Sequence, residues 1–199
     1  MEAIIIGVAG LKGGTGKTVT AIYLAAAAHK QGKQVTVIDA DSEQSALNWA
    51  SGSLDFDVIA ADKALSKQAK ALKKAGHVVL IDNSPNSRDL LYSTALCSDR
   101  IVVPTGATGQ EVNRLAPTLQ ILHEVEESRD TALTSILLTK YDRRRVLSRE
   151  FLEVFAEYPL LDTKISHKAI YQSEFGMMPT YTLEYSNVLW ELTNGVNES

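Results

Sequence analysis

The sequence has little cysteine and no long hydrophobic run. Cys97 is the only cysteine among the 199 residues, which excludes an internal disulfide framework and a metal cage built from the cysteines of one chain. The longest alanine-rich run, Ala21 to Ala28, ends at His29 and Lys30 and falls short of the roughly 20 apolar residues that span a bilayer. The first residues lack a basic region, so they predict a strand and not a signal peptide. We therefore expect a cytoplasmic protein in a reducing compartment.

Charge and histidine content narrow the possibilities further. The formal net charge is −4, which disfavours binding of nucleic acid through the whole surface, so any basic patch must be local. The four histidines are scattered along the chain without metal-ligand spacing; they are His29, His77, His123 and His167. A chain of this length with 45% hydrophobic residues can bury one sizeable core. We expect a single domain over residues 1–199.

Short apolar runs alternate with longer segments of helical character. Strands are expected at Ile4–Ala9, Val35–Asp39, Val78–Asp82, Ile101–Pro104 and Ile136–Thr139. Helices are expected at Lys17–Lys30, Asp62–Lys74, Ser87–Leu96, Gln110–Glu127, Leu147–Glu157, Lys168–Phe175 and Leu183–Leu192. The strand runs are continuously apolar, which is typical of parallel strands covered on both sides. The sequence therefore predicts an α/β fold, with a mostly parallel, twisted sheet and helices on both faces.

A glycine-rich loop between the first strand and the first helix predicts a phosphate site. It reads Gly13-Gly14-Thr15-Gly16-Lys17-Thr18. Glycines let backbone N–H groups point at phosphate oxygens, and the helix N-terminus adds partial positive charge. Lys17 is expected at the β- and γ-phosphates of ATP, and the Thr18 hydroxyl is expected on Mg²⁺. The alternative is a glycine-rich turn without a ligand, which the strand-loop-helix context disfavours.

The start of this loop departs from the common phosphate-loop pattern. Leu11 stands where that pattern has glycine, and Lys12 comes directly before the double glycine. Residues 11–18 thereby resemble the deviant Walker A motif, x-K-G-G-x-G-K-[ST], of the ParA/MinD superfamily of P-loop ATPases. The resemblance implies catalytic roles for Lys12 and Lys17, with Lys12 reaching across an ATP-bound homodimer to the partner's phosphates. The alternative for Lys12 is a solvated loop lysine.

Three aspartates follow at strand ends, where open α/β sheets bind ligands. Asp82 ends an apolar run that reads as a Walker B motif, so we expect it in the Mg²⁺ shell. The segment that begins at Asp39 resembles the family's D-x-D-P-Q segment, with Ser42 and Glu43 in place of proline and glutamine. The resemblance implies that Asp41 positions or activates the attacking water and that Asp39 supports the Mg²⁺ shell. The alternative for Asp41 is capping of the helix that follows.

The second half of the chain extends the resemblance, which covers about residues 3 to 180 and fits the short ParA proteins of plasmid partition. Thr139 and Tyr141 lie where that family places contacts to adenine. Residues 140–149 carry a local net charge of +4 and predict nonspecific contacts to DNA phosphates. The candidates are Arg143, Arg144, Arg145 and Arg149, with Lys168 as an extension. The alternative is a solvated helix face or ion pairs to Glu150 and Glu153.

The resemblance implies a DNA-partition ATPase. ATP would drive a sandwich dimer onto nonspecific DNA of the nucleoid. A centromere-binding or cargo-adaptor protein would then stimulate an otherwise slow hydrolysis. Two alternatives stay open. A MinD-like positioning ATPase needs an amphipathic membrane anchor, and the acidic tail from Trp190 onward has no basic face for one, so we expect no membrane partner. A P-loop metabolic ligase needs a second substrate pocket, for which the sequence has no signature.

Overall fold

The computed structural model describes residues 2–106, 114–131, 133–142 and 160–194. Within these ranges the chain forms a six-stranded sheet with the order β3-β2-β4-β1-β5-β6, and every pairing is parallel. The strands are β1 (Ile5–Val8), β2 (Val35–Ala40), β3 (Asp57–Ala60), β4 (Val78–Asn83), β5 (Arg100–Thr105) and β6 (Thr134–Leu138). The predicted parallel α/β sheet is confirmed. The edge strand β3 was not predicted, because it is only half-buried and has no continuous apolar run.

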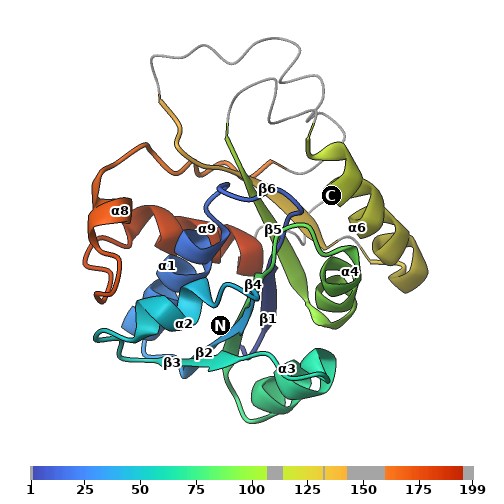
Figure 1. The fold of residues 1–199 in the computed structure, drawn as a ribbon, viewed down its shortest axis with the longest axis horizontal. Helices are drawn as coiled ribbons and strands as arrows, with labels where there is room; N and C mark the ends of the chain where they lie inside the picture. Colours follow the sequence, from blue (N-terminus) through green and yellow to red (C-terminus); the bar gives the residue numbers. More distant parts are fainter. Residues whose placement is uncertain (1, 107–113, 132, 143–159, 195–199) are drawn as a thin grey trace.

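Helices cover both faces of this sheet (Figure 1). One face carries α1 (Lys17–Lys30), α2 (Ser45–Ala50), α8 (Ile170–Ser173) and α9 (Leu183–Asn194); the other carries α3 (Leu65–Lys74), α4 (Arg88–Cys97) and α6 (Ala116–Arg129). Adjacent strand residues belong to opposite layers of the core. Ile6 packs in the cluster with α1 and α9, whereas Ile5 packs in the cluster with α3.

Helix α1 lies between the sheet and α9, and this position explains its composition. All eight residues from Ala21 to Ala28 are fully buried. Four consecutive alanines end this run, and their small side chains allow α1 to approach the sheet and its covering helix closely. Because the helix has so little solvent-facing surface, it lacks the polar stripe of an ordinary surface helix. None of the described helices is long and apolar enough to cross a membrane.

Several predicted helix boundaries were wrong. Helix α3 begins at Leu65 instead of Asp62, because the Asp62 carboxylate accepts the backbone N–H of Ala64 in a preceding turn. Helix α6 begins at Ala116, after a turn at residues 114–115, with a proline in its first turn, where a missing N–H is tolerated. Residues 110–113 of that predicted helix lie outside the described residues. Helix α8 covers only four residues of the predicted segment. The predicted helix at 147–157 lies outside the described residues.

Candidate functional site

The register of the sheet brings the predicted site residues to one edge. Strand β4 pairs with β1 on one side and with β2 on the other, so that Asp82 lies opposite Val8 and opposite Asp39. The glycine-rich loop leaves β1 at this same carboxyl edge and leads into α1. Gly14 and Gly16 adopt φ of 74° and 95°, a left-handed conformation that favours glycine. The loop glycines at these two positions are therefore required by the backbone itself.

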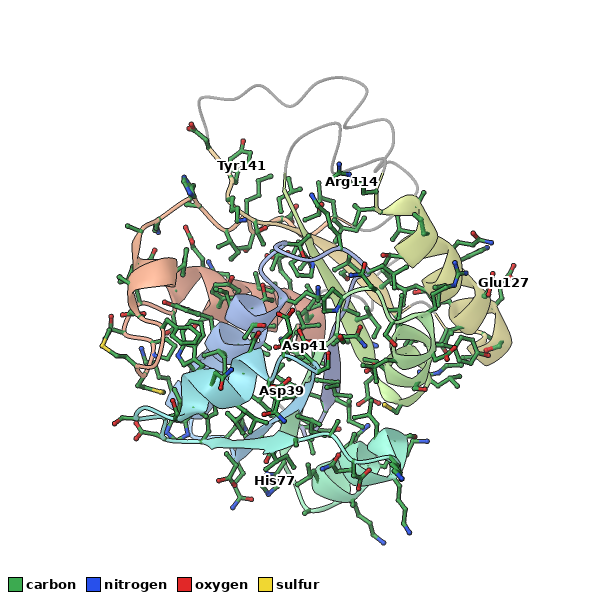
Figure 2. The ribbon with its side chains drawn as sticks, in the orientation of Figure 1. Asp39, Asp41, His77, Arg114, Glu127 and Tyr141 are labelled. Atoms are coloured by element: carbon green, nitrogen blue, oxygen red, sulfur yellow. The ribbon has the colours of Figure 1, made fainter. Side chains whose placement is uncertain are left out.

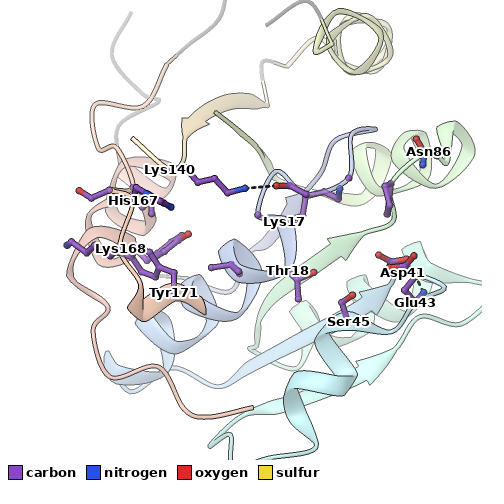
Figure 3. Close-up of a pocket in the computed structure, with 18 residues that line it drawn as sticks. Lys17, Thr18, Asp41, Glu43, Ser45, Asn86, Lys140, His167, Lys168 and Tyr171 are labelled. Atoms are coloured by element: carbon purple, nitrogen blue, oxygen red, sulfur yellow. Dashed lines mark hydrogen bonds between the residues drawn. The ribbon is translucent and has the colours of Figure 1, made fainter. Parts of the chain in front are cut away.

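The loop borders a cavity of about 540 Å³, within the size range of small-molecule sites. Figure 3 shows Lys17 and Thr18 between two walls: Asp41, Glu43 and Asn86 lie on one side, and Lys140, His167, Lys168 and Tyr171 lie on the other. The remaining lining residues are Gly13, Gly14, Gly16, Val19, Ser45, Pro85, Ile165, Ser166 and Tyr185. The cavity thus joins the predicted phosphate loop to a wall from the last third of the chain.

Leu11 is the residue that departs from the common loop pattern, and its surroundings explain it. The side chain packs against the hydrophobic cluster of α4 and α6. Its backbone is held at both ends, since its N–H donates to the Thr118 hydroxyl at 3.1 Å and its carbonyl accepts the Asn86 N–H at 2.9 Å. A leucine here anchors the entrance of the loop to the opposite helical layer, which glycine could not do.

The other end of the loop is held by residues that follow β6. The Thr139 hydroxyl lies 3.1 Å from the Thr15 carbonyl, and the Lys140 ammonium donates to the Gly14 carbonyl at 2.9 Å. Thr139 is buried against the loop. Tyr141 lies near the top of the view in Figure 2. Adenine contacts from Thr139 and Tyr141 stay a prediction. The described geometry gives Thr139 a supporting role, and it adds Lys140, which was not predicted for the nucleotide site.

Lys17 is buried under the loop, and its ammonium donates to the Lys12 carbonyl at 2.8 Å. Burial lowers the pKa of Lys17, and the carboxylates of Asp82 and Asp41 partly offset this effect. The Lys17 ammonium is therefore bound to a backbone carbonyl of the loop itself, at the cavity where phosphates are expected. Lys12 is half-buried, and its predicted action on a partner's nucleotide stays a prediction.

Asp82 has the chemistry expected of a metal-shell carboxylate. The residue is 1% exposed, and neither carboxylate oxygen has a hydrogen-bond partner among the described residues. Burial raises its pKa to about 7, although the Thr18 hydroxyl and the Lys17 ammonium act in the opposite direction. A buried carboxylate without partners is costly unless a cation compensates it. Thr18 and Asp82 therefore fit Mg²⁺, which keeps most of its other ligands as water and phosphate oxygen.

Asp39 and Asp41 differ in what their carboxylates do. Asp39 accepts the N–H of Asp41 and the N–H of Leu47, both at 2.9 Å, so it caps the start of α2 and fixes the Asp41 loop. Asp41 lines the cavity, and the N–H that it accepts belongs to Glu43, before α2, so the cap observed in the described structure comes from Asp39. The Oδ1 atom of Asp41 accepts the Glu43 N–H at 3.1 Å and the Ser84 hydroxyl at 3.2 Å. Ser84, which the sequence did not single out, thus positions the predicted catalytic carboxylate.

A carboxylate on α9 fixes the wall across from Asp41. Glu184 accepts hydrogen bonds from the Ser166 backbone and hydroxyl, from the Lys168 ammonium at 3.0 Å, and from the Tyr171 hydroxyl. Burial alone raises the pKa of Glu184, but these bonds hold it below its ordinary value. No motif pointed to Glu184, because its partners lie 13 to 18 residues away and meet it only in the fold.

The predicted DNA contacts are only partly described. Arg143, Arg144, Arg145 and Arg149 lie outside the described residues. Lys168 lies in the cavity wall, where its ammonium donates to the Tyr181 hydroxyl at 2.9 Å and pairs with Glu184. The hydrogen bond to Tyr181, followed by the bond to Glu184, raises the pKa of Lys168. Its role as a DNA contact stays a prediction.

Residues 6–177 match the family model described as the CobQ/CobB/MinD/ParA nucleotide-binding domain. The chain belongs to this family. Membership confirms the predicted resemblance and the predicted P-loop ATPase. The prediction of ATP with Mg²⁺ agrees with the phosphate loop and with the buried carboxylate of Asp82.

Three relatives illustrate the range of proteins that this ATPase resembles. It is 23% identical to maintenance of carboxysome distribution protein A of Halothiobacillus neapolitanus, over 86% of this chain and 83% of the relative. It is 27% identical to the chromosome-partitioning ATPase Soj of Thermus thermophilus, over 73% of this chain and 72% of the relative. The septum site-determining protein MinD of Pyrococcus horikoshii, solved with Mg-ADP, shares the fold with a TM-score of 0.75 at 17% identity. The match covers 98% of this chain and 97% of the MinD chain.

Replacing Glu184 by glutamine tests whether α9 positions the cavity wall. Glu184→Gln keeps the shape but removes the charge that holds Lys168, Ser166 and Tyr171. Hydrogen bonds to charged groups contribute about 1.5–3 kcal/mol and neutral ones about 1 kcal/mol. The substitution therefore costs on the order of 1 kcal/mol, and we expect ATP to bind about threefold to tenfold more weakly in calorimetric titration. The matched control is Glu191→Gln, on the same helix, whose carboxylate accepts two backbone N–H groups outside the cavity. Equal ATP affinity in both variants would contradict this role.

Proposed function

We propose that this ATPase positions a large DNA cargo, a plasmid or chromosome, by binding nonspecific DNA as an ATP-bound homodimer. The observation that carries the proposal is the cavity itself, in which Asp41 faces the phosphate loop from a separate strand end. A carboxylate so placed suits the activation of water for hydrolysis. Two of the relatives are named for carboxysome distribution and for chromosome partitioning, which supports a positioning role. A different large cellular body is the close variant of this cargo.

The chain's own residues suggest how hydrolysis proceeds. ATP places its phosphates on the loop and its nucleoside toward the wall that Glu184 holds. Lys17 exchanges its bond to the Lys12 carbonyl for phosphate oxygens, and Asp41 orients the attacking water. Thr18 and Asp82 would hold Mg²⁺, which would neutralise charge on the phosphates. The partner subunit's Lys12 completes charge compensation in the dimer, so hydrolysis controls the dimer's lifetime.

A partner protein is the remaining element of the proposal. Slow hydrolysis keeps the dimer on DNA until a centromere-binding or cargo-adaptor protein stimulates it, after which monomers leave. This cycle requires DNA affinity to depend on the nucleotide. Nothing among the described residues favours the ligase alternative, and no specific observation supports a membrane-bound variant.

Loss of Asp41 separates ATP binding from hydrolysis. Asp41→Ala removes the carboxylate that faces the phosphates, so we expect ATP to bind within about threefold of wild type while phosphate release falls at least tenfold. The ATP-bound dimer should then persist in size-exclusion chromatography. Glu43→Ala is the matched control, since Glu43 lines the same wall and its carboxylate has no assigned role. Wild-type turnover in Asp41→Ala would remove the assignment.

Retention on random-sequence duplex DNA tests the proposed partner. With ATP we expect retention that weakens steeply between low and moderate salt, and with ADP we expect little, because only the dimer doubles the basic surface. The triple variant Arg143→Ala, Arg144→Ala, Arg145→Ala should bind ATP normally and lose DNA. If wild type is not retained with either nucleotide, the DNA-binding function is wrong and the ATPase assignment still stands.

A further inference from the structure

Helix α3 and the turn before it carry a row of lysines that the nucleotide site does not use. Lys67, Lys70 and Lys74 lie on one side of the helix because they are spaced by three and four residues, and Lys63 lies in the turn directly before the helix. We call these four residues the α3 lysine row. All four residues are exposed. The opposite side of the helix is buried, with Leu65 and Ala69 in the hydrophobic cluster beneath the sheet. The row therefore faces solvent because packing fixes the other side of α3.

Among the described residues, no ion pair is found for any of the four lysines. A further lysine of the helix, Lys73, pairs with Asp99 at 2.7 Å and is not part of the row. The chain as a whole has a net charge of −4, so three lysines on α3 and one directly before it form a distinct local positive field.

A groove runs beside the row, between α3 and the start of α4. Its volume is about 890 Å³, and Lys63, Lys67 and Lys70 line it together with the hydroxyl-bearing residues Ser66, Ser87 and Ser93. Ammonium and hydroxyl groups are donors that suit phosphate oxygens. Two acids also line the groove: Asp62, whose Oδ1 accepts the Ala64 N–H, and Asp89 in the first turn of α4. The lysines outnumber them along this face.

We propose that the α3 lysine row binds the phosphate backbone of duplex DNA. Lys67 to Lys74 spans about 10 Å along the helix at ~1.5 Å per residue, a length over which duplex DNA presents about six phosphate charges. Helix α3 has no exposed large apolar side chain, which a membrane-binding helix requires. It also lacks the aromatic and arginine residues typical of protein interfaces, where lysine is depleted. Charge complementarity without base-reading groups fits sequence-independent DNA binding.

Helix α3 lies away from Lys168, the DNA candidate that the structure describes, because Lys168 lies just before α8. Figure 1 shows α3 beside α4, on the opposite face of the sheet from α8 and α9. The inference rests on the proposed DNA-binding function for its choice of partner. It adds a second contact surface that the local run of charge in the sequence did not indicate.

The test measures DNA affinity of the full chain with ATP as a function of salt, by fluorescence anisotropy of a labelled random-sequence duplex. Lys67→Gln with Lys70→Gln removes two contacts and preserves helix propensity. Each lost phosphate contact lowers the slope of log affinity against log salt by about 0.9, so we expect the slope to fall by about 2 and low-salt affinity to fall at least fivefold. The control Lys30→Gln with Lys33→Gln removes the same net charge elsewhere and should leave the slope unchanged.

The outcomes separate this inference from the proposed function. Lys67→Arg with Lys70→Arg retains the charges and should bind DNA as wild type does, which excludes misfolding as the cause of a loss. Suppose that wild type binds DNA, that the arginine triple variant does not, and that the Lys67→Gln, Lys70→Gln variant binds DNA as the Lys30→Gln, Lys33→Gln control does. That result overturns the inference, and the proposed function stands. Absence of DNA binding by wild type overturns both.

Discussion

The parallel pairing of β4 with β1 and β2 is the constraint on which the site depends. This register puts Asp82 between Val8 and Asp39. The phosphate loop follows β1 at this same carboxyl edge of the sheet. The register also buries the Asp82 carboxylate where the described protein atoms give it no hydrogen bond. Such burial is unfavourable in the ligand-free protein, so a cation with phosphate oxygens would complete the site. The same sheet edge presents Asp41, which is held by Ser84 from the end of β4.

The phosphate loop is shaped by contacts that lie far away in sequence. Thr118 and Asn86 hold its entrance, and Thr139 and Lys140 hold its turn. The loop sequence alone therefore specifies which groups bind phosphate, while the remaining layers specify where these groups lie. Glu184 plays the corresponding part for the opposite wall. A cavity built in this way couples nucleotide binding to the packing of α6, α9 and the segment after β6.

The sequence was informative where a function depends on local pattern. The buried strands, the glycine loop and the Walker B aspartate were predicted because each is a short, contiguous signal. The edge strand β3 was missed because its residues are half exposed. Ser84, Glu184 and the capping role of Asp39 were missed because each acts through residues brought near only by the fold. The α3 lysine row was missed for another reason, which is that its charges are three or four residues apart in the sequence. Counting charges over a short stretch of sequence favours the consecutive arginines instead.

Thermal unfolding of the wild-type chain with its ligands tests the central claim, that the loop and the buried Asp82 carboxylate form one site for ATP with Mg²⁺. A ligand at 100 times its Kd stabilises the folded state by about 2.7 kcal/mol. We expect a clear rise in Tm with ATP and Mg²⁺ together, a smaller rise with ATP and EDTA, and little change with Mg²⁺ alone. In Asp82→Asn, the additional rise due to Mg²⁺ should disappear. An equal rise with ATP in the presence of Mg²⁺ or EDTA would contradict the account.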